Sequence, residues 1–133
     1  MIKKVDHIGI ATSNLEAIRE QYKHILPDVE PSEHVVESQK SKILCYNVGG
    51  VRLEFLEPTA EDSPIAKFIA KRGQGLHHVC LETDDIKTDI DKMASEGCKL
   101  IDKEPREGMN NTKVAFIHPA SCGSVLTELC QKS

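Results

Sequence analysis

The feature that most constrains this chain is an internal repeat. The segment D-H-I-G-I at 6–10 matches H-H-V-C-L at 77–81, and L-E-F-L at 53–56 matches T-E-L-C at 127–130. The two offsets are 77 − 6 = 71 and 127 − 53 = 74 residues, and a drift of three residues fits a small loop insertion. Because similar segments are expected to fold alike, the chain predicts two copies of one supersecondary unit.

The first copy, about residues 3–58, predicts the order βαβββ. Its opening strand alternates apolar residues on one face with His7 on the other. A capping box of Ser13 and Glu16 predicts the start of an amphipathic helix. Three further strands follow, with Gly49-Gly50 as a tight turn between the last two. They are expected at 34–36, 43–48 and 51–57.

The second copy, about residues 75–131, repeats this order. It predicts a strand at 76–81 and a helix that Asp85 caps and Gly97 closes. A turn-rich stretch is expected at 105–108. A short helix at 63–73, with Ser63 at its N-cap, joins the copies. The remaining strands are expected at 98–101, 113–117 and 125–130.

The predicted fold class is therefore α+β, with two tandem βαβββ modules forming a curved mixed sheet. The 133 residues, at 14.8 kDa, fit one domain over 1–133. The composition, 39% hydrophobic and 29% charged, is that of a globular protein and not of a disordered chain.

Charge and composition exclude several classes of partner. The net charge is −4 without a basic block, so a nucleic-acid partner is not expected. No apolar run approaches the ~20 residues of a membrane span. Asp6 lies where a signal peptide would need its apolar stretch, so a cytoplasmic protein is expected. Five cysteines without a C-x-x-C pair predict free thiols rather than a disulfide framework.

Four residues related by the repeat point to chemistry. His7 and His78 lie in the first strand of each module, and Glu54 and Glu128 lie in the last. Strand alternation places His7, Glu54 and His78 opposite the helix-packed face, and the repeat argues the same for Glu128. A lone strand histidine or glutamate is more often structural. Four at corresponding positions predict a shared catalytic site for one divalent metal, Co, Zn, Ni, Mn or Fe.

The chain resembles the vicinal oxygen chelate superfamily, which includes glyoxalase I, extradiol dioxygenases and antibiotic-resistance proteins. Within it, the chain resembles the methylmalonyl-coenzyme A epimerases. The matching words are DHIGIA at 6–11, RLEFLEP at 52–58, SPIAKFIAKRGQGLHHV at 63–79, LIDKEPREG at 100–108, VAFIHP at 114–119 and VLTELCQ at 125–131. They run through nearly the whole chain and imply the glyoxalase-like fold.

The resemblance implies that His7, Glu54, His78 and Glu128 are metal ligands, although the position of Glu54 can be Gln in family members. His78 is the ligand rather than His77, which is expected to face the helix side. The implied activity is epimerisation of methylmalonyl-coenzyme A through a metal-stabilised enolate, with a small acyl-CoA substrate and a homodimer. Glu128 is the first candidate for the base that removes the proton.

Two positions bear on the details of that activity. Some related epimerases carry a second glutamate where this chain has Ile43, so the second proton carrier is open among Glu54, Glu37 and a water. Arg106 is a candidate for holding a substrate carboxylate or a coenzyme phosphate, with an exposed surface arginine as the simpler interpretation.

Three other functions fit the same fold. A glyoxalase I-like lactoylglutathione lyase uses the same two-His, two-Glu set. An iron dioxygenase would normally use two His and one carboxylate and is less favoured. A non-catalytic drug-binding module would present aromatic rings to its ligand, and this chain has only five Tyr and Phe, three of them at positions expected in the core.

Overall fold

The structure is a computed structural model that describes residues 1–133. It contains eight strands and three α-helices, so the expected α+β class is confirmed. The helices are α1 (Leu15–Ile25), α2 (Pro64–Arg72) and α3 (Ile86–Ser95). The strands are β1 (Ile2–Ala11), β2 (Ser32–Val36), β3 (Ser41–Val48), β4 (Val51–Pro58), β5 (Gly75–Thr83), β6 (Arg106–Glu107), β7 (Lys113–Ile117) and β8 (Leu126–Gln131).

The chain divides into two compact units. Unit 1 consists of Met1–His7 and His78–Ser133, and unit 2 consists of Ile8–His77. The boundary therefore cuts both β1 and β5, and each unit contains a part of both strands. In unit 2 the order of hydrogen-bonded strands is β2-β3-β4 and the second part of β1. In unit 1 it is the first part of β1, then β5-β8-β7-β6.

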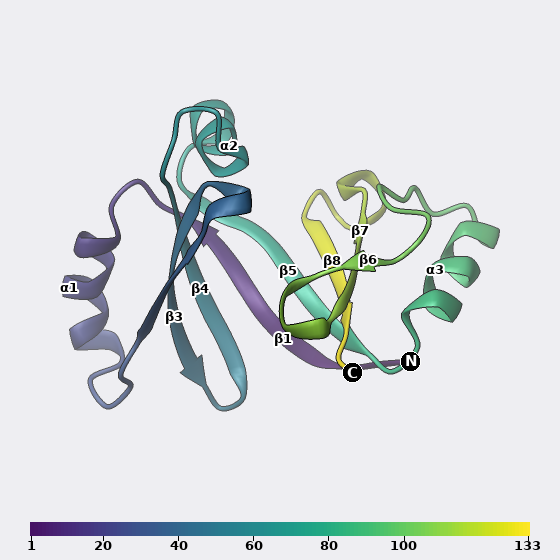
Figure 1. The fold of residues 1–133 in the computed structure, drawn as a ribbon, viewed down its shortest axis with the longest axis horizontal. Coiled ribbons are helices and arrows are strands. Elements are labelled where there is room, and N and C mark those ends of the chain that lie inside the picture. The colour runs from purple at the N-terminus through teal and green to yellow at the C-terminus, as the bar shows by residue number, and fades with distance from the viewer. The chain divides into compact units, whose positions relative to one another are not determined.

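Unit 2 is held together by an apolar cluster between α1 and its strands (Figure 1). Leu15 on α1, Leu44 and Tyr46 on β3 and Phe55 on β4 are its buried members. The ring centres of Tyr22 and Phe55 lie 4.9 Å apart, in an edge-on contact. The expected tight turn between β3 and β4 is confirmed, because Gly49 and Gly50 both have positive φ, the conformation that a two-residue hairpin turn requires.

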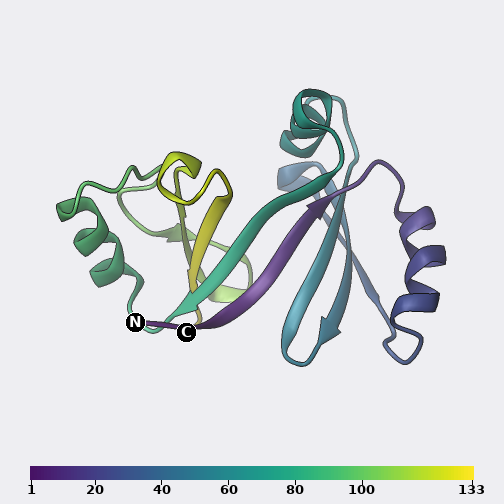
Figure 2. The ribbon, with the colours of Figure 1, turned by 180° about the vertical axis from the view of Figure 1, so that it is seen from behind.

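Unit 1 has its own core, in which α3 lies beside β7 and β8, as the reverse view in Figure 2 also shows. Ile86 and Ile90 on α3 pack against Ala115, Ile117 and Leu129 of these strands. Strand β8 runs parallel to β5 and antiparallel to β7. Because Leu129 is buried beneath α3, its neighbour Glu128 belongs to the opposite face of β8.

Equivalent hydrogen bonds hold the N-terminus of one helix in each unit. Glu57 Oε1 at the end of β4 accepts a hydrogen bond from the backbone N–H of Leu15, at 3.0 Å. In unit 1, Gln131 Oε1 at the end of β8 accepts one from Ile86, at 2.8 Å. These pairs follow the repeat, since 15 + 71 = 86 and 57 + 74 = 131. One orphan donor of each helix is thus satisfied by the strand on which the helix packs.

The helix caps agree with the sequence except at α1. Asp85 and Ser63 cap α3 and α2 as expected. The cap of α1 is not Ser13 but Asn14, whose side chain accepts from the N–H of Ala17. The reason is that Ser13 is already used: its N–H and its hydroxyl both donate to Gln74 Oε1.

Two expectations for the last third of the chain are wrong. The segment 98–101 is not a strand and forms only one isolated bridge, between Leu100 and Ile117. Instead the stretch expected as a turn contains β6, which pairs with the start of β7. No helix of the structure is long and apolar enough to cross a membrane.

We predict that Gln131→Ala lowers the free energy of unfolding by about 1 kcal/mol, since it removes the acceptor at the N-terminus of α3. Glu57→Ala should lower it by a similar amount through α1. Urea unfolding followed by circular dichroism measures both values. The control is Glu104→Ala, which removes only an exposed side chain paired with Lys87. If Gln131→Ala unfolds at the same urea concentration as this control, the anchor has no stabilising role.

Candidate functional site

Three of the four predicted ligands come together within unit 1. His7 is on β1, His78 on β5 and Glu128 on β8. The Nε2 atoms of the two histidines lie 3.1 Å apart. Glu128 Oε1 lies 3.3 Å from His7 Nε2 and 3.5 Å from His78 Nε2. Each of the three side chains is only 11–12% exposed, so their polar atoms face one another and not open solvent.

This spacing fits a divalent cation. Around an ion with bonds of about 2.1 Å, neighbouring ligand atoms lie about 3.0 Å apart at right angles and about 3.4 Å apart at tetrahedral angles. The three separations, 3.1, 3.3 and 3.5 Å, lie within about 0.1 Å of this range. Two imidazole nitrogens and a carboxylate oxygen that lie so close repel one another unless a proton or a cation is shared among them. The donor set is therefore that of a borderline transition metal.

The fourth predicted ligand, Glu54, lies on β4 in unit 2. Its side chain is 15% exposed, and its Oε2 lies 3.4 Å from Arg52 Nε. Phe55 next to it is buried against α1, so Glu54 belongs to the face of β4 opposite that helix, as the alternation predicts.

The adjacent histidines of β5 have different surroundings, as expected. The ring of His77 packs edge-on against Phe68 of α2, with 4.8 Å between the ring centres. His78 contacts His7 and lies with its ring centre 6.4 Å from that of Phe116. One histidine is thus a packing residue of unit 2, whereas the other belongs to the polar cluster of unit 1.

A buried carboxylate, Asp6, was not expected at this site. It is 4% exposed, and its Oδ2 lies 2.8 Å from Nδ1 of His7. Its Oδ1 lies 2.9 Å from Lys132 Nζ, which also reaches Glu82 at 3.1 Å. The hydrogen bonds to Asp6 and Glu82 raise the pKa of Lys132. The sequence signal was the D-H dipeptide itself, but strand alternation assigns its two side chains to opposite faces.

Two thiols lie against the same cluster. Cys80 Sγ lies within 4.8 Å of ligand atoms of His7 and Glu128, and both Cys80 and Cys130 lie within that distance of the Asp6 carboxylate. The contact with Cys130 and burial together raise the pKa of the Cys80 thiol, which keeps it protonated. All five cysteines are free, as expected. The Cys80 thiol is therefore an uncharged neighbour of the polar residues.

Ile43 and Arg106 also have clear environments. Ile43 on β3 packs against the buried cluster of Ala11, Leu56 and Ile65, so its side chain has apolar surroundings. Arg106 on β6 is exposed, with its guanidinium 5.3 Å from the ring centre of Phe116 and 3.4 Å from Asp102. Because Phe116 also neighbours His78, Arg106 lies one side chain away from the histidine cluster.

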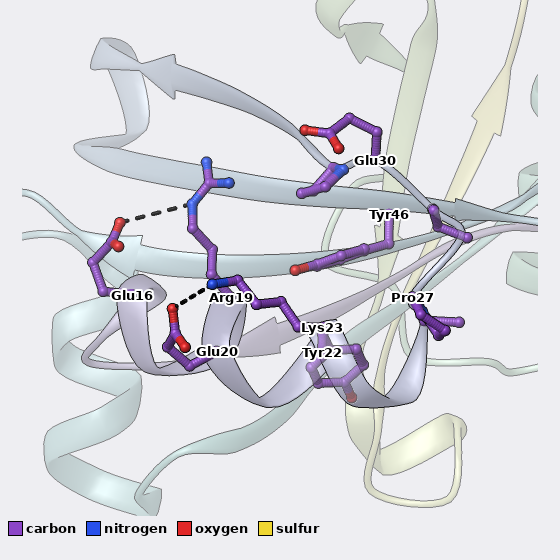
Figure 3. Close-up of a pocket in the computed structure, with 11 residues that line it drawn as sticks. Glu16, Arg19, Glu20, Tyr22, Lys23, Pro27, Glu30 and Tyr46 are labelled. Carbon is purple, nitrogen blue, oxygen red and sulfur yellow. Dashed lines mark hydrogen bonds and ion pairs between the residues drawn. The ribbon is translucent and has the colours of Figure 1, made fainter.

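A cavity of about 380 Å³ in unit 2 contains none of the four predicted ligands. Its walls come from α1, the segment after it and Tyr46 of β3 (Figure 3). Two ion pairs, Glu16–Arg19 and Glu20–Lys23, lie along α1 at this cavity. Most of its charges therefore already have partners of opposite sign.

Comparison with known proteins gives a consistent family. Residues 6–116 match the Glyoxalase/Bleomycin resistance protein/Dioxygenase superfamily. The uncharacterized protein YqjC of Bacillus subtilis is 36% identical over 130 residues, covering 98% of this chain and 93% of that protein. The mitochondrial methylmalonyl-CoA epimerase of Bos taurus is 34% identical, covering 96% of this chain and 74% of that protein.

A solved structure extends this likeness to the fold. A methylmalonyl-CoA epimerase in complex with methylmalonyl-CoA and NH4+ is 34% identical, with a TM-score of 0.86 over 100% of this chain and 96% of that one. The match confirms the glyoxalase-like fold that the sequence implied. The chain therefore belongs to the Glyoxalase/Bleomycin resistance protein/Dioxygenase superfamily, in which its relatives include methylmalonyl-CoA epimerases.

Proposed function

We propose that this protein is a metal-dependent epimerase of methylmalonyl-CoA. The observation that carries the proposal is the convergence of His7, His78 and Glu128 to separations of 3.1–3.5 Å within unit 1. Relatives at about one-third identity over nearly the whole chain carry the epimerase name, which gives the substrate class. None of the relatives described above is a lactoylglutathione lyase, so that alternative has no comparable support.

The proposed ligands are His7, Glu54, His78 and Glu128. His7, His78 and Glu128 offer the donor atoms described above, and Glu54 is added because it occupies the position in the first module that Glu128 has in the second. Co, Zn, Ni and Mn all accept imidazole and carboxylate ligands. When bound, such an ion supplies a Lewis acid that stabilises the negative charge of an enolate.

In the proposed epimerisation, the side chains remove one proton and return one. The carbon between a thioester carbonyl and a carboxylate carries an acidic hydrogen, and epimerisation removes it and returns one to the opposite face. Glu128 is the proposed base, because its carboxylate is nearly buried and is held beside both imidazoles.

The opposite face needs a second proton carrier, and Ile43 cannot supply one. Glu54 is the proposed second group, with Glu37 and a water as the remaining candidates. Arg106 is proposed to hold the carboxylate or a phosphate of the substrate, since its planar guanidinium can bind two oxygens at once. Its place over Phe116 keeps it near the histidine cluster of unit 1.

The first prediction from the proposed function concerns Glu128. Cobalt-loaded protein incubated with methylmalonyl-CoA in heavy water should incorporate deuterium with inversion, as followed by NMR. Glu128→Gln should slow this exchange by about 10²–10⁴-fold, because the amide cannot accept the proton. Glu107→Gln, which changes an exposed glutamate of β6, should leave the rate unaltered.

Other outcomes of this experiment would indicate a different function or a different base. Turnover of a glutathione thiohemiacetal without deuterium exchange would make the protein a glyoxalase I-like lyase. No activity in either assay, together with no bound metal, would indicate a non-catalytic binding module. Full exchange by Glu128→Gln would assign the base to another residue.

The second prediction separates the adjacent histidines. His78→Ala should weaken Co²⁺ binding by more than about 100-fold, because loss of a ligand should cost more than loss of a residue that only supports one. His77→Ala should bind Co²⁺ normally and unfold at lower temperature, since it loses its contact with Phe68. Visible absorption of Co²⁺ and a thermal melt measure the two effects. Equal losses of Co²⁺ affinity would contradict the assignment of His78 as the ligand.

The third prediction concerns Glu54. Glu54→Gln should keep the Co²⁺ affinity within a few-fold, because an amide oxygen can still bind the ion, whereas Glu54→Ala should lose about tenfold or more. If Glu54 also carries a proton, Glu54→Gln should exchange one epimer of the substrate and not the other. Equal exchange of both epimers would transfer that role to Glu37 or to a water.

Two expectations from the sequence remain predictions. A homodimer should give twice the 14.8 kDa mass in light scattering. A cytoplasmic location should be visible in fractionated cells.

A further inference from the structure

The candidate for a new role is the pair of charged groups behind His7, Asp6 and Lys132. Asp6 lies between His7 Nδ1, at 2.8 Å, and Lys132 Nζ, at 2.9 Å. Asp6 is 4% exposed, and the buried thiols of Cys80 and Cys130 lie beside its carboxylate. All of these residues belong to unit 1.

The contact with Asp6 decides which nitrogen of His7 carries the proton. A neutral imidazole has one N–H and one lone pair, and an ionised carboxylate can only accept. With Asp6 at Nδ1, the proton belongs on Nδ1, and the lone pair of Nε2 points toward His78 and Glu128. A metal ligand needs this tautomer, because only a nitrogen without a proton can bind the ion.

Lys132 has a different role, which is to compensate the charge of Asp6. A buried carboxylate is costly unless a cation or hydrogen bonds compensate its charge. Lys132 does so at Oδ1, which leaves Oδ2 for His7. Because an ammonium group has only donors, Lys132 attracts an oxygen of the side chain at position 6 and disfavours an NH2 group there.

We propose that Asp6 is a positioning residue that fixes the Nδ1–H tautomer of His7, and that Lys132 fixes the orientation of Asp6. The proposal rests on the metal site proposed above, but the tautomer of His7 is a property of the protein without metal. The proton position and the catalytic activity can therefore be tested apart.

Asp6→Asn gives the sharpest test. Because the Lys132 ammonium attracts an oxygen and disfavours an NH2 group, the amide oxygen of the new side chain should turn to Lys132 and its NH2 group to His7. That NH2 donates to Nδ1 and moves the imidazole proton to Nε2, the wrong nitrogen for a ligand. Replacing the buried aspartate of a serine protease triad by asparagine likewise leaves the neighbouring histidine in the wrong tautomer.

A second variant should reverse the defect. In Asp6→Asn combined with Lys132→Met, the ammonium group no longer holds the amide oxygen away from His7, so the amide can turn and accept from Nδ1 again. Lys132→Met alone should keep the wild-type tautomer, since Asp6 remains an acceptor. Asp89→Asn is the matched control, because Asp89 is a half-buried carboxylate of unit 1 that contacts the N-terminal ammonium and Thr83 instead.

The measurement is the long-range 1H–15N spectrum of histidine-labelled, metal-free protein at a pH where imidazoles are neutral, followed by Co²⁺ titration. The wild type and Asp89→Asn should show Nδ1–H at His7. Asp6→Asn should show Nε2–H and bind Co²⁺ about 10–100-fold more weakly, and the double variant should regain the wild-type tautomer and part of the affinity.

Each outcome decides a part of the proposal. An unchanged tautomer in Asp6→Asn overturns the role of Asp6, and a double variant that keeps Nε2–H overturns the role of Lys132. A tautomer that moves without any change in Co²⁺ affinity overturns the link to the metal. If the wild type shows the Nδ1–H tautomer but binds no metal and exchanges no deuterium, the proposed function fails while the tautomer assignment stands.

Discussion

The anchoring of each helix by the last strand of its module is the contact on which the rest of the structure depends. Glu57 bonds the N-terminus of α1 and Gln131 that of α3. Each anchor stands three residues after the glutamate that the repeat singles out, Glu54 and Glu128. Because three is an odd number, an anchor that faces the helix leaves the glutamate on the opposite face of the strand. A one-residue slip of either strand would exchange these faces, so the anchor selects the register as well as stabilising the helix.

Most of the fold could be predicted from the sequence because its signals are local and occur twice. The hairpin at Gly49-Gly50 and the caps at Ser63 and Asp85 follow from short-range chemistry. The errors arise where a distant residue intervenes. Ser13 donates its hydrogen bonds to Gln74, so Asn14 caps α1 instead. Strand β6 forms only because it pairs with β7.

The candidate site was predictable to the same extent. Periodicity and the repeat select His7, His78 and Glu128, which the structure brings together in unit 1. They could not select Asp6, because alternation assigns adjacent side chains to opposite faces, and they could not select Lys132, which comes from the far end of the chain. Groups that orient a ligand depend on tertiary contacts, and no spacing rule in one sequence encodes them.

The repeat makes the two glutamates equivalent in position but not in surroundings. Glu54 has the guanidinium of Arg52 3.4 Å away, whereas Glu128 lies between two imidazoles. The two proposed proton carriers therefore differ in their immediate partners, a guanidinium for Glu54 and two imidazoles for Glu128, although the repeat gives them corresponding positions.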